Sequence, residues 1–239
     1  MSEVLAHYRD IWNRKPVLRA VYRDMFDRIA TRCGPGPTLD IGAGIGKLKE
    51  RLPDVIASDV QYSPWLDLVA DAQNLPFAPG SLGNIVMVDV LHHVEFPIAF
   101  LQAAGEALRP GGRLIMIEPA ITWGSSLFYR FIHQEPVVMS ADLFATGAPD
   151  PDRDPYDANQ AIPILLVRNR ERFHRLVPSL QIAEVAWFSF AVYPLSGGFK
   201  SWSLLSEAMA RRCLHLEQRF ERRIGRLLGF RMLIAVERL

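Results

Sequence analysis

The stretch Leu39–Gly46, LDIGAGIG, restricts the fold of this chain more than any other. Thr38–Ile41 is short and mostly apolar and follows the turn-rich CGPGP, so it is predicted to be a buried strand. Three alternating glycines follow, and then the helix-like run Lys47–Leu52. Glycine accepts backbone angles that other residues avoid, and a ligand can press against bare backbone at a helix N-terminus. The stretch therefore predicts a nucleotide-type pocket, and the question is which nucleotide it binds.

Further strands and one helix are predicted up to Pro119, and they extend this unit into a sheet. The link at 60–65 is shorter than the dozen or so residues of an ordinary parallel crossover. Strands that are apolar on both faces and alternate with helices or short crossovers indicate a doubly wound parallel sheet. We therefore expect an α/β fold. Its predicted strands are 54–59, 66–71, 82–90 and 113–118 besides the first, and its helix is 97–108.

The polar residues of this region follow the ends of the predicted strands. Ligands bind doubly wound sheets at the carboxyl ends of their strands, near the switch in strand order. The candidates there are the glycines, Asp59, Asp71, Asp89 with His92 and His93, and Glu118.

The remaining segments are predicted from periodicity and turn residues. Residues 3–32 form helical stripes that Pro16 divides, and the acidic, proline-rich segment 147–159 is predicted to be an exposed loop. No internal repeat or clean linker divides the chain, so a single domain over 1–239 is expected. The other predictions are helices at 125–133, 170–177 and 201–228, strands at 181–190 and 231–237, and a turn-rich loop at 193–199.

Composition excludes several classes of partner and location. The 239 residues carry a net charge of +1, which gives no general electrostatic reason to bind nucleic acid or an anionic membrane. Cys33 and Cys213 lack metal-type spacing, and the N-terminus has no apolar signal core. No run approaches the roughly 20 apolar residues of a membrane span. We therefore expect a cytoplasmic protein with free thiols, no metal site, no nucleic-acid partner and no transmembrane segment.

The glycine spacing narrows the choice of nucleotide. The pattern is G-x-G-x-G rather than the dinucleotide fingerprint G-x-G-x-x-G, and no phosphate-binding G-x-x-x-x-G-K-[ST] occurs. Asp59 ends the second strand, where a carboxylate can accept hydrogen bonds from both hydroxyls of a ribose. Asp71 ends the third strand and could accept from an adenine amine or cap a turn. A nicotinamide oxidoreductase is thereby disfavoured.

Five segments in order resemble the motifs of class I S-adenosylmethionine-dependent methyltransferases. They are LDIGAGIG, the acid Asp59, DAQNLPF at 71–77, VDVLHHV at 88–94 and LRPGGRLIMIEP at 108–119. The similarity is greatest to the small-molecule branch that includes ubiquinone and menaquinone methyltransferases. It implies a Rossmann-like, seven-stranded sheet, mostly parallel with the last strand antiparallel, plus a mainly helical cap. It also implies N-terminal helices at 1–34, a cofactor-binding half at 35–120, an acceptor-side insertion at 121–200 and a closing helix and strand at 201–239.

The resemblance also implies roles in binding S-adenosyl-L-methionine. Gly42 and Gly44 would face its amino-acid and ribose parts, and Asp40 would lie close to its ammonium group; the alternative for Asp40 is bracing the glycine turn. Asp59 would take the ribose hydroxyls. The adenine would meet Asp71 and Ala72, and the methionyl side would be lined by Asp89 and Val90.

Methyl transfer needs a general base only where the acceptor must lose a proton. His92, His93 and Glu118 are the candidates, and His133 with Glu135 is a further one. One of two adjacent histidines usually points away or satisfies the backbone, and Glu118 could instead cap the next segment.

Most of the aromatic residues of 120–230 are expected in the core, and a few could shape an apolar acceptor pocket. The leading hypothesis is a methyltransferase that acts at oxygen or carbon of a small acceptor that is apolar or aromatic. The arginine-rich amphipathic helix 201–228 leaves peripheral membrane contact open, although packing on the sheet with a solvated arginine face is the favoured interpretation. An S-adenosylmethionine-binding protein without turnover, acting as a partner or regulator, is the alternative function.

Overall fold

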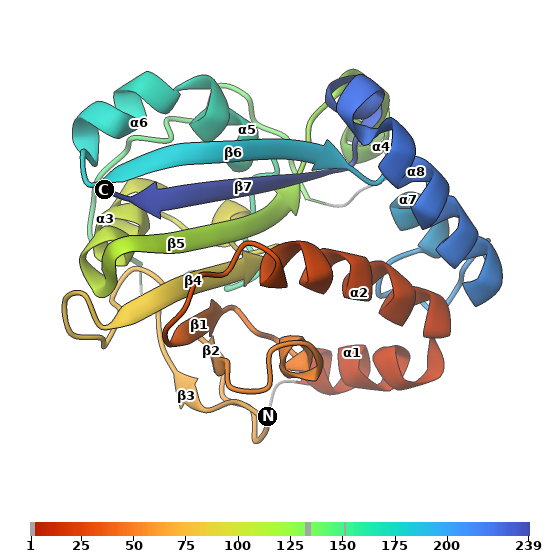
Figure 1. Cartoon of the computed structure of the whole chain (residues 1–239), viewed down its shortest axis with the longest axis horizontal. Helices are drawn as coiled ribbons and strands as arrows, with labels where there is room; N and C mark the ends of the chain where they lie inside the picture. The colour runs from red at the N-terminus through yellow and green to blue at the C-terminus, as the bar shows by residue number, and fades with distance from the viewer. Residues whose placement is uncertain (1–2, 132–134, 151) are drawn as a thin grey trace.

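The computed structural model describes residues 3–131, 135–150 and 152–239 and contains a seven-stranded mixed sheet. The strand order is β3-β2-β1-β4-β5-β7-β6, so the order reverses between β1 and β4 (Figure 1). The strands are β1 (Thr38–Ile41), β2 (Ile56–Asp59), β3 (Leu68–Val69), β4 (Leu82–Val88), β5 (Leu108–Pro119), β6 (Leu180–Phe188) and β7 (Arg231–Arg238).

Hydrogen-bond register confirms the predicted sheet. Neighbouring strands from β3 to β5 are parallel, whereas β7 runs antiparallel to both β5 and β6. The central strands β4 and β5 are buried on both faces, and successive residues contribute to two separate cores. In β4, for example, Ile85 and Met87 enter one core and Val86 enters the other. The doubly wound α/β fold with an antiparallel last strand is therefore confirmed.

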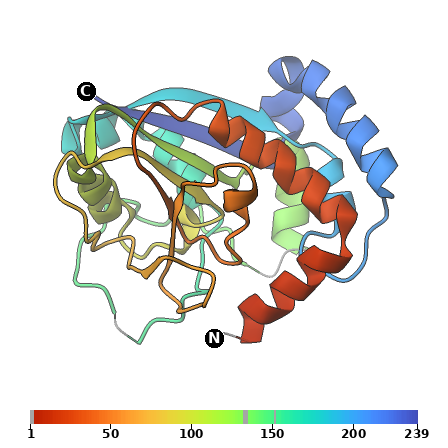
Figure 2. The same cartoon turned by 60° about the horizontal axis from the view of Figure 1, so that its bottom comes forward.

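Helices cover both faces of the sheet (Figures 1 and 2). The first core takes its helical residues from α3 (Pro97–Ala107), α5 (Ile162–Arg168) and α6 (Arg170–Leu176). The second takes them from α1 (Glu3–Arg14), α2 (Pro16–Ala30), α7 (Val192–Ser196) and α8 (Glu207–Leu228). Helix α4 (Trp123–Phe131) follows β5, and short 3-10 turns η1 (Lys47–Glu50) and η2 (Leu91–His93) follow β1 and β4.

Several predicted boundaries are wrong. The third strand has only two residues, and β5 begins at Leu108, because the RPGG segment continues the strand where the sequence predicted a turn. Helix α5 was not predicted, since its short apolar run IPILLVR has no polar face. Residues 192–196 form α7 within the segment predicted to be a loop. Helix α8 starts at Glu207, where the side chain of Ser206 caps the backbone N–H of Met209.

The prediction that α8 packs on the sheet and leaves an arginine face in solvent is also wrong in part. The helix contacts β6 and α2 through small or polar residues, of which Ala210, Glu217 and Gly225 are buried. Gly225 lies so close to the carbonyl of Trp187 that a Cβ would be 2.3 Å from it, which explains the close approach. Large apolar residues assigned to the core side from the sequence are exposed instead, among them Met209, Leu216, Phe220 and Leu227.

Candidate active site

The glycine turn after β1 lies against the end of β4. Gly42 has a φ of 66°, and a Cβ added there would stand 2.3 Å from Cγ2 of Val90. Gly44 has a φ of 52°. Both are left-handed conformations that side chains disfavour. The turn therefore presents bare backbone, and the predicted residues Gly42 and Val90 meet.

Asp59 at the end of β2 supports the same turn. Its Oδ2 accepts from the backbone N–H of Gly44 at 2.9 Å, and its Oδ1 accepts from that of Gln61 at 2.9 Å. The short link after β2 adds Trp65, whose indole Nε1 donates to the carbonyl of Gly44 at 2.9 Å. A carboxylate oxygen has more than one acceptor position, so Asp59 can hold the turn and still accept from a ligand.

Asp40 lies in β1 beneath the turn and is buried. Burial, with a smaller contribution from Asp59, raises the pKa of its carboxyl to about 8. No hydrogen bond to this carboxyl is formed by the described residues. The alternative role for Asp40 was to brace the glycine turn. In the structure it is the Asp59 side chain that bonds to this turn, at the backbone N–H of Gly44. Among the described residues the buried carboxyl of Asp40 has no cationic partner, and its place near the ammonium group of a ligand stays a prediction.

Asp71 and Ala72 follow β3, which pairs with β2 through Asp59 and Val69. The Asp71 carboxylate accepts from the backbone N–H of Gln73 at 2.8 Å and so forms a local turn. Asp71 is exposed and Ala72 packs against the first core. The structure thus places both near the end of β2, with the turn-capping role of Asp71 in place.

Asp89 directly follows β4 and has a left-handed conformation, with a φ of 59°. Its two carboxylate oxygens pair with the guanidinium of Arg231, the first residue of β7. Arg231 is 2% exposed, its Cζ lies 3.8 Å from the ring centroid of Tyr193, and its Nε has no partner among the described residues. Burial raises the pKa of the nearby Tyr22, Tyr129 and Tyr193, so these hydroxyls stay protonated.

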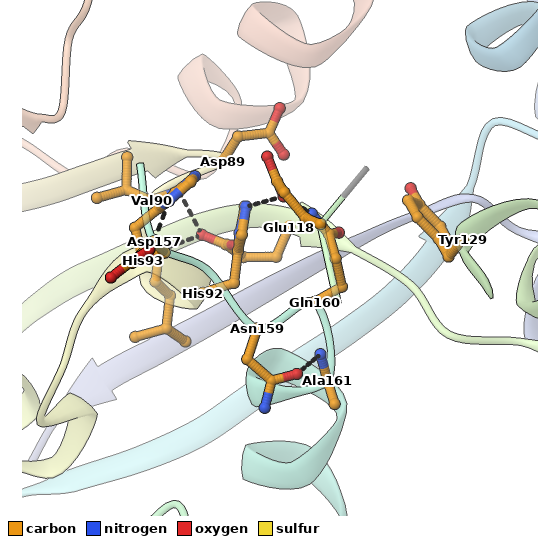
Figure 3. A network of polar contacts seen from close by, with 12 residues as sticks. Asp89, Val90, His92, His93, Glu118, Tyr129, Asp157, Asn159, Gln160 and Ala161 are labelled. Carbon is orange, nitrogen blue, oxygen red and sulfur yellow. Dashed lines mark hydrogen bonds and ion pairs between the residues drawn. The ribbon is translucent and has the colours of Figure 1, made fainter. Parts of the chain in front are cut away.

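Glu118 and His92 form a buried pair at the end of β5 (Figure 3). Nδ1 of His92 is 2.6 Å from Glu118 Oε2, while Glu118 Oε1 accepts from the backbone N–H groups of Val90 and Leu91 at 3.0 and 2.7 Å. Burial alone would lower the pKa of His92, but the Glu118 carboxylate outweighs it and raises the pKa to about 9. Glu118 therefore caps the turn that follows β4 rather than the segment that follows Glu118 itself, and it also holds His92 as a cation.

His93 has the opposite protonation preference. Its Nδ1 lies 3.2 Å from the backbone carbonyl of Asp157, which can only accept, so the hydrogen is on Nδ1 and Nε2 carries the lone pair. Burial, and then the charge of His92, lower the pKa of His93. The two adjacent histidines therefore divide into a buried cation and a neutral, half-buried base.

Residues 135–162 close this region from the other side. Glu135 Oε2 is 3.5 Å from Nε2 of His92 and is also contacted by the amide of Gln160. A cavity of about 490 Å³ is lined by residues of 92–97 on one side and of 135–162 on the other. Its lining includes His92, Glu135 and Arg153. The other candidate, His133, lies outside the described residues.

The structure also brings three metal-capable side chains together, although the sequence predicted no metal site. The potential ligand atoms of His92, His93 and Glu135 lie within 4.8 Å of one another, and so do those of Asp89, His92 and Glu118. Nδ1 of His92 already contacts Glu118, so only the first of these two groups leaves its Nε2 for an ion, and the His92 cation would have to lose its proton before it could bind one.

Sequence reasoning missed Arg231, Trp65 and the tyrosines around Arg231. Arg231 did carry a signal, because it opens an otherwise apolar strand, RMLIAVE. Tyr22 and Tyr193 carried none, since each fits the apolar pattern of its own segment.

Comparison with known proteins relates the chain to methyltransferases. A family model described as a methyltransferase domain matches residues 39–116, from β1 to the middle of β5. None of the curated proteins matches the sequence significantly. The fold and the family match identify a class I S-adenosylmethionine-dependent methyltransferase. The chain is therefore a methyltransferase enzyme, and S-adenosyl-L-methionine is its cofactor.

Solved structures share the fold over nearly the whole chain. A Thermotoga maritima protein described as an S-adenosylmethionine-dependent methyltransferase, possible histamine N-methyltransferase, is 14% identical with a TM-score of 0.60, covering 93% of this chain and 92% of its own. An Archaeoglobus fulgidus S-adenosylmethionine-dependent methyltransferase is 15% identical with a TM-score of 0.58 and coverages of 92% and 94%. A Haloferax volcanii methyltransferase complex with the Trm112 activator matches with 14% identity, a TM-score of 0.51 and coverages of 98% and 93%.

No helix in the described part of the chain is long and apolar enough to cross a membrane.

Proposed function

We propose that this methyltransferase acts on oxygen or carbon of a small acceptor with an apolar or aromatic body, and that His93 removes the acceptor's proton. The observation that carries the proposal is the different protonation of the two adjacent histidines, of which His92 lines the cavity. His93 is neutral and keeps Nε2 for a proton, whereas His92 is held as a cation by Glu118. A base is useful for hydroxyl or enolisable carbon acceptors, whose lone pair or carbanion must be released.

The residues of the glycine turn fit the cofactor. Gly42 and Gly44 offer backbone, Asp59 has acceptor capacity for the ribose hydroxyls, and buried Asp40 would face the ammonium group. Asp71 and Ala72 would hold the adenine, and Asp89 and Val90 the methionyl side. When bound, S-adenosyl-L-methionine supplies an electrophilic methyl group on a sulfonium. The contribution of the chain is to align the acceptor, exclude water and take its proton.

The acceptor is expected to be amphiphilic. Buried Tyr129 and half-buried Tyr22 and Tyr193 lie around Asp89 and Arg231 and favour an aromatic or apolar part. The cavity of about 490 Å³ is within the usual range for small-molecule sites. Charged residues dominate the polar lining of that cavity, so the acceptor must also carry polar groups. They are His92, Glu95, Glu135, Asp142, Arg153 and Asp157.

The membership of the ubiquinone and menaquinone branch is part of this proposal and rests on the motif similarity. An amine acceptor is the second candidate, because four carboxylates line the cavity and the Thermotoga protein is described as a possible histamine N-methyltransferase.

A two-step experiment tests the proposal. Calorimetry with S-adenosylmethionine and S-adenosylhomocysteine measures cofactor binding, and absence of binding to both would contradict the cofactor roles. Release of S-adenosylhomocysteine is then followed with matched phenols, enolisable ketones and amines. Turnover of phenols or ketones supports the proposal, whereas turnover of amines alone overturns it.

Variants of the two histidines assign the base. His93→Gln is expected to lower kcat by about 100-fold, the typical contribution of general base catalysis, with unchanged cofactor affinity. Its pH profile should lose the limb that reports deprotonation of the base. A His93→Gln enzyme with the full rate would exclude this residue as the base.

A further inference from the structure

Helix α8 carries a row of large apolar side chains on its outer side. Met209, Leu216, Phe220 and Leu227 are between 42% and 54% exposed. Their spacings of seven, four and seven residues put them on one side of a helix with 3.6 residues per turn. Their row lies beside the buried positions Ala210 and Glu217 rather than on them.

Helix α4 carries a second row. Trp123, Leu127 and Phe131 follow one another at intervals of four residues and are 75%, 65% and 71% exposed. The two helices meet where Gly124 lies against Leu228 and the carbonyl of Leu227, so the row on α8 ends where the row on α4 begins. We call these seven residues the α4–α8 surface. A contiguous exposed apolar patch of this kind marks an interaction site.

Arginines lie next to this surface. Arg212, Arg219, Arg223 and Arg226 are exposed and spaced by seven, four and three residues, which places them on the side of α8 adjoining its apolar row. None of the four forms a salt bridge with a carboxylate of the described residues. Their charge is therefore available to an anionic partner.

We propose that the α4–α8 surface docks on an anionic lipid bilayer. A helix with an apolar face and arginines beside it lies in a membrane interface, with its apolar side chains among the acyl chains and its cations at the headgroups. Self-association through the same surface would bring two arginine rows together, which like-charge repulsion disfavours. Charge complementarity thus selects the bilayer as the occupant.

Docking would place the acceptor site at the membrane. The inner side of α4 carries buried Tyr129, whose hydroxyl donates to the carbonyl of Phe230 next to Arg231, so α4 separates the bilayer from the tyrosines around that residue. This link rests on the proposed function, since it implies an acceptor whose apolar part resides in the membrane. The docking itself does not depend on catalysis.

Sedimentation of the full chain with vesicles tests the docking. Vesicles of phosphatidylcholine alone are compared with vesicles containing one third phosphatidylglycerol, at low and at physiological salt. We expect the chain to sediment with the anionic vesicles and binding to weaken as salt rises. Absence of binding, or equal binding to both compositions, overturns the proposal.

Two variants locate the contact. Trp123→Ser with Leu127→Ser and Phe131→Ser removes the apolar row of α4, and Arg212→Gln with Arg219→Gln and Arg223→Gln removes the charges. Each is expected to reduce partitioning at least about tenfold. The matched control is Arg170→Gln with Arg175→Gln and Leu176→Ser on α6, which is equally exposed but lies on the other face of the sheet. If the control loses as much binding as the other variants, the assignment is wrong.

Further measurements separate a lost membrane contact from misfolding and from self-association. Circular dichroism and thermal unfolding confirm that each variant is folded, and calorimetry with S-adenosylmethionine confirms that its cofactor site is intact. Sedimentation equilibrium without lipid tests the second occupant. A dimer that the α4 variant dissociates, together with no lipid binding, would assign the surface to a second copy of the chain and overturn the membrane proposal.

Discussion

Two regions of the candidate site are built in different ways. The cofactor edge is the glycine turn after β1 with its supporting residues, and the acceptor side is the region around Asp89 and His92. At the cofactor edge, Gly44 is held by Asp59 and Trp65, which are 15 and 21 residues away. On the acceptor side, Asp89 pairs with Arg231 across 142 residues, and His92 approaches Glu135 in a separate segment. A region of local contacts can be recognised from one stretch of sequence, whereas a region of distant contacts cannot.

The largest effect is expected where this distant pairing is broken. Asp89→Asn leaves the guanidinium of Arg231 buried without its carboxylate, and removal of one partner from a buried ion pair costs about 4 kcal/mol of unfolding free energy. Denaturant unfolding of the variant measures this loss.

The converse variant sharpens the comparison. Arg231→Met should cost less, because the side chain of Asp89 is 26% exposed and can regain water, whereas that of Arg231 is 3% exposed. Equal losses for both variants would contradict this account of the pair.

A second effect concerns the pH dependence of stability. Because the folded pKa of His92 is raised to about 9, the stability from its protonation is complete below its unfolded pKa and is lost as pH rises through about 9. A shift of this size corresponds to about 3 kcal/mol. Unfolding free energies between pH 6 and pH 10 should therefore fall more for the parent chain than for His92→Gln.

His93 provides the matched control for this measurement. Its folded pKa is lowered, so its contribution is lost as pH falls below the unfolded value rather than as pH rises. His93→Gln should thus keep the alkaline loss of stability. Disappearance of that loss in His93→Gln would reverse the assignment of the two histidines.

The same contrast explains how much the sequence could predict. LDIGAGIG and the acid of β2 defined the turn, the sheet and the cofactor, because strand, glycines and carboxylate are fixed by local geometry. The sequence also named Asp89, His92 and Glu118, since the ends of parallel strands meet at one edge. It could not supply their partners. Whether Arg231 faces Asp89 or solvent depends on the antiparallel register of β7 with β5, and that register is set by packing across the whole sheet.

Helix α8 shows a second reason for failure. Its pattern predicted an apolar face, and the face exists, but small residues rather than large ones make the close contact with β6. Periodicity identifies the sides of a helix and does not tell which side the rest of the protein covers.

A third effect isolates the local geometry of the cofactor edge. Gly42→Ala places a Cβ at φ 66° against Val90, so both backbone strain and displacement of Val90 contribute, about 2–3 kcal/mol together. Gly111→Ala is the control, because its φ is 72° but nothing lies within 4 Å of the added Cβ. It should cost only the strain, about 1–2 kcal/mol. Denaturant unfolding measures both losses of unfolding free energy. Identical losses for the two variants would show that the contact between the turn and Val90 is unimportant.

The smallest effect tests the ligand role of Asp59 against its structural role. Asp59→Ala removes both the support of Gly44 and the expected ribose contact, which should weaken cofactor affinity by about 1–3 kcal/mol in calorimetry. Asp59→Asn keeps one amide oxygen for the N–H of Gly44, but its NH2 group replaces the oxygen that accepts from the N–H of Gln61, and the charge is lost. If the carboxylate binds the ribose, the asparagine variant should lose less stability than the alanine variant and still bind the cofactor weakly. If both variants bind the cofactor as the parent does, the Asp59 carboxylate only supports the glycine turn. The cofactor is then bound at this edge of the sheet without the carboxylate.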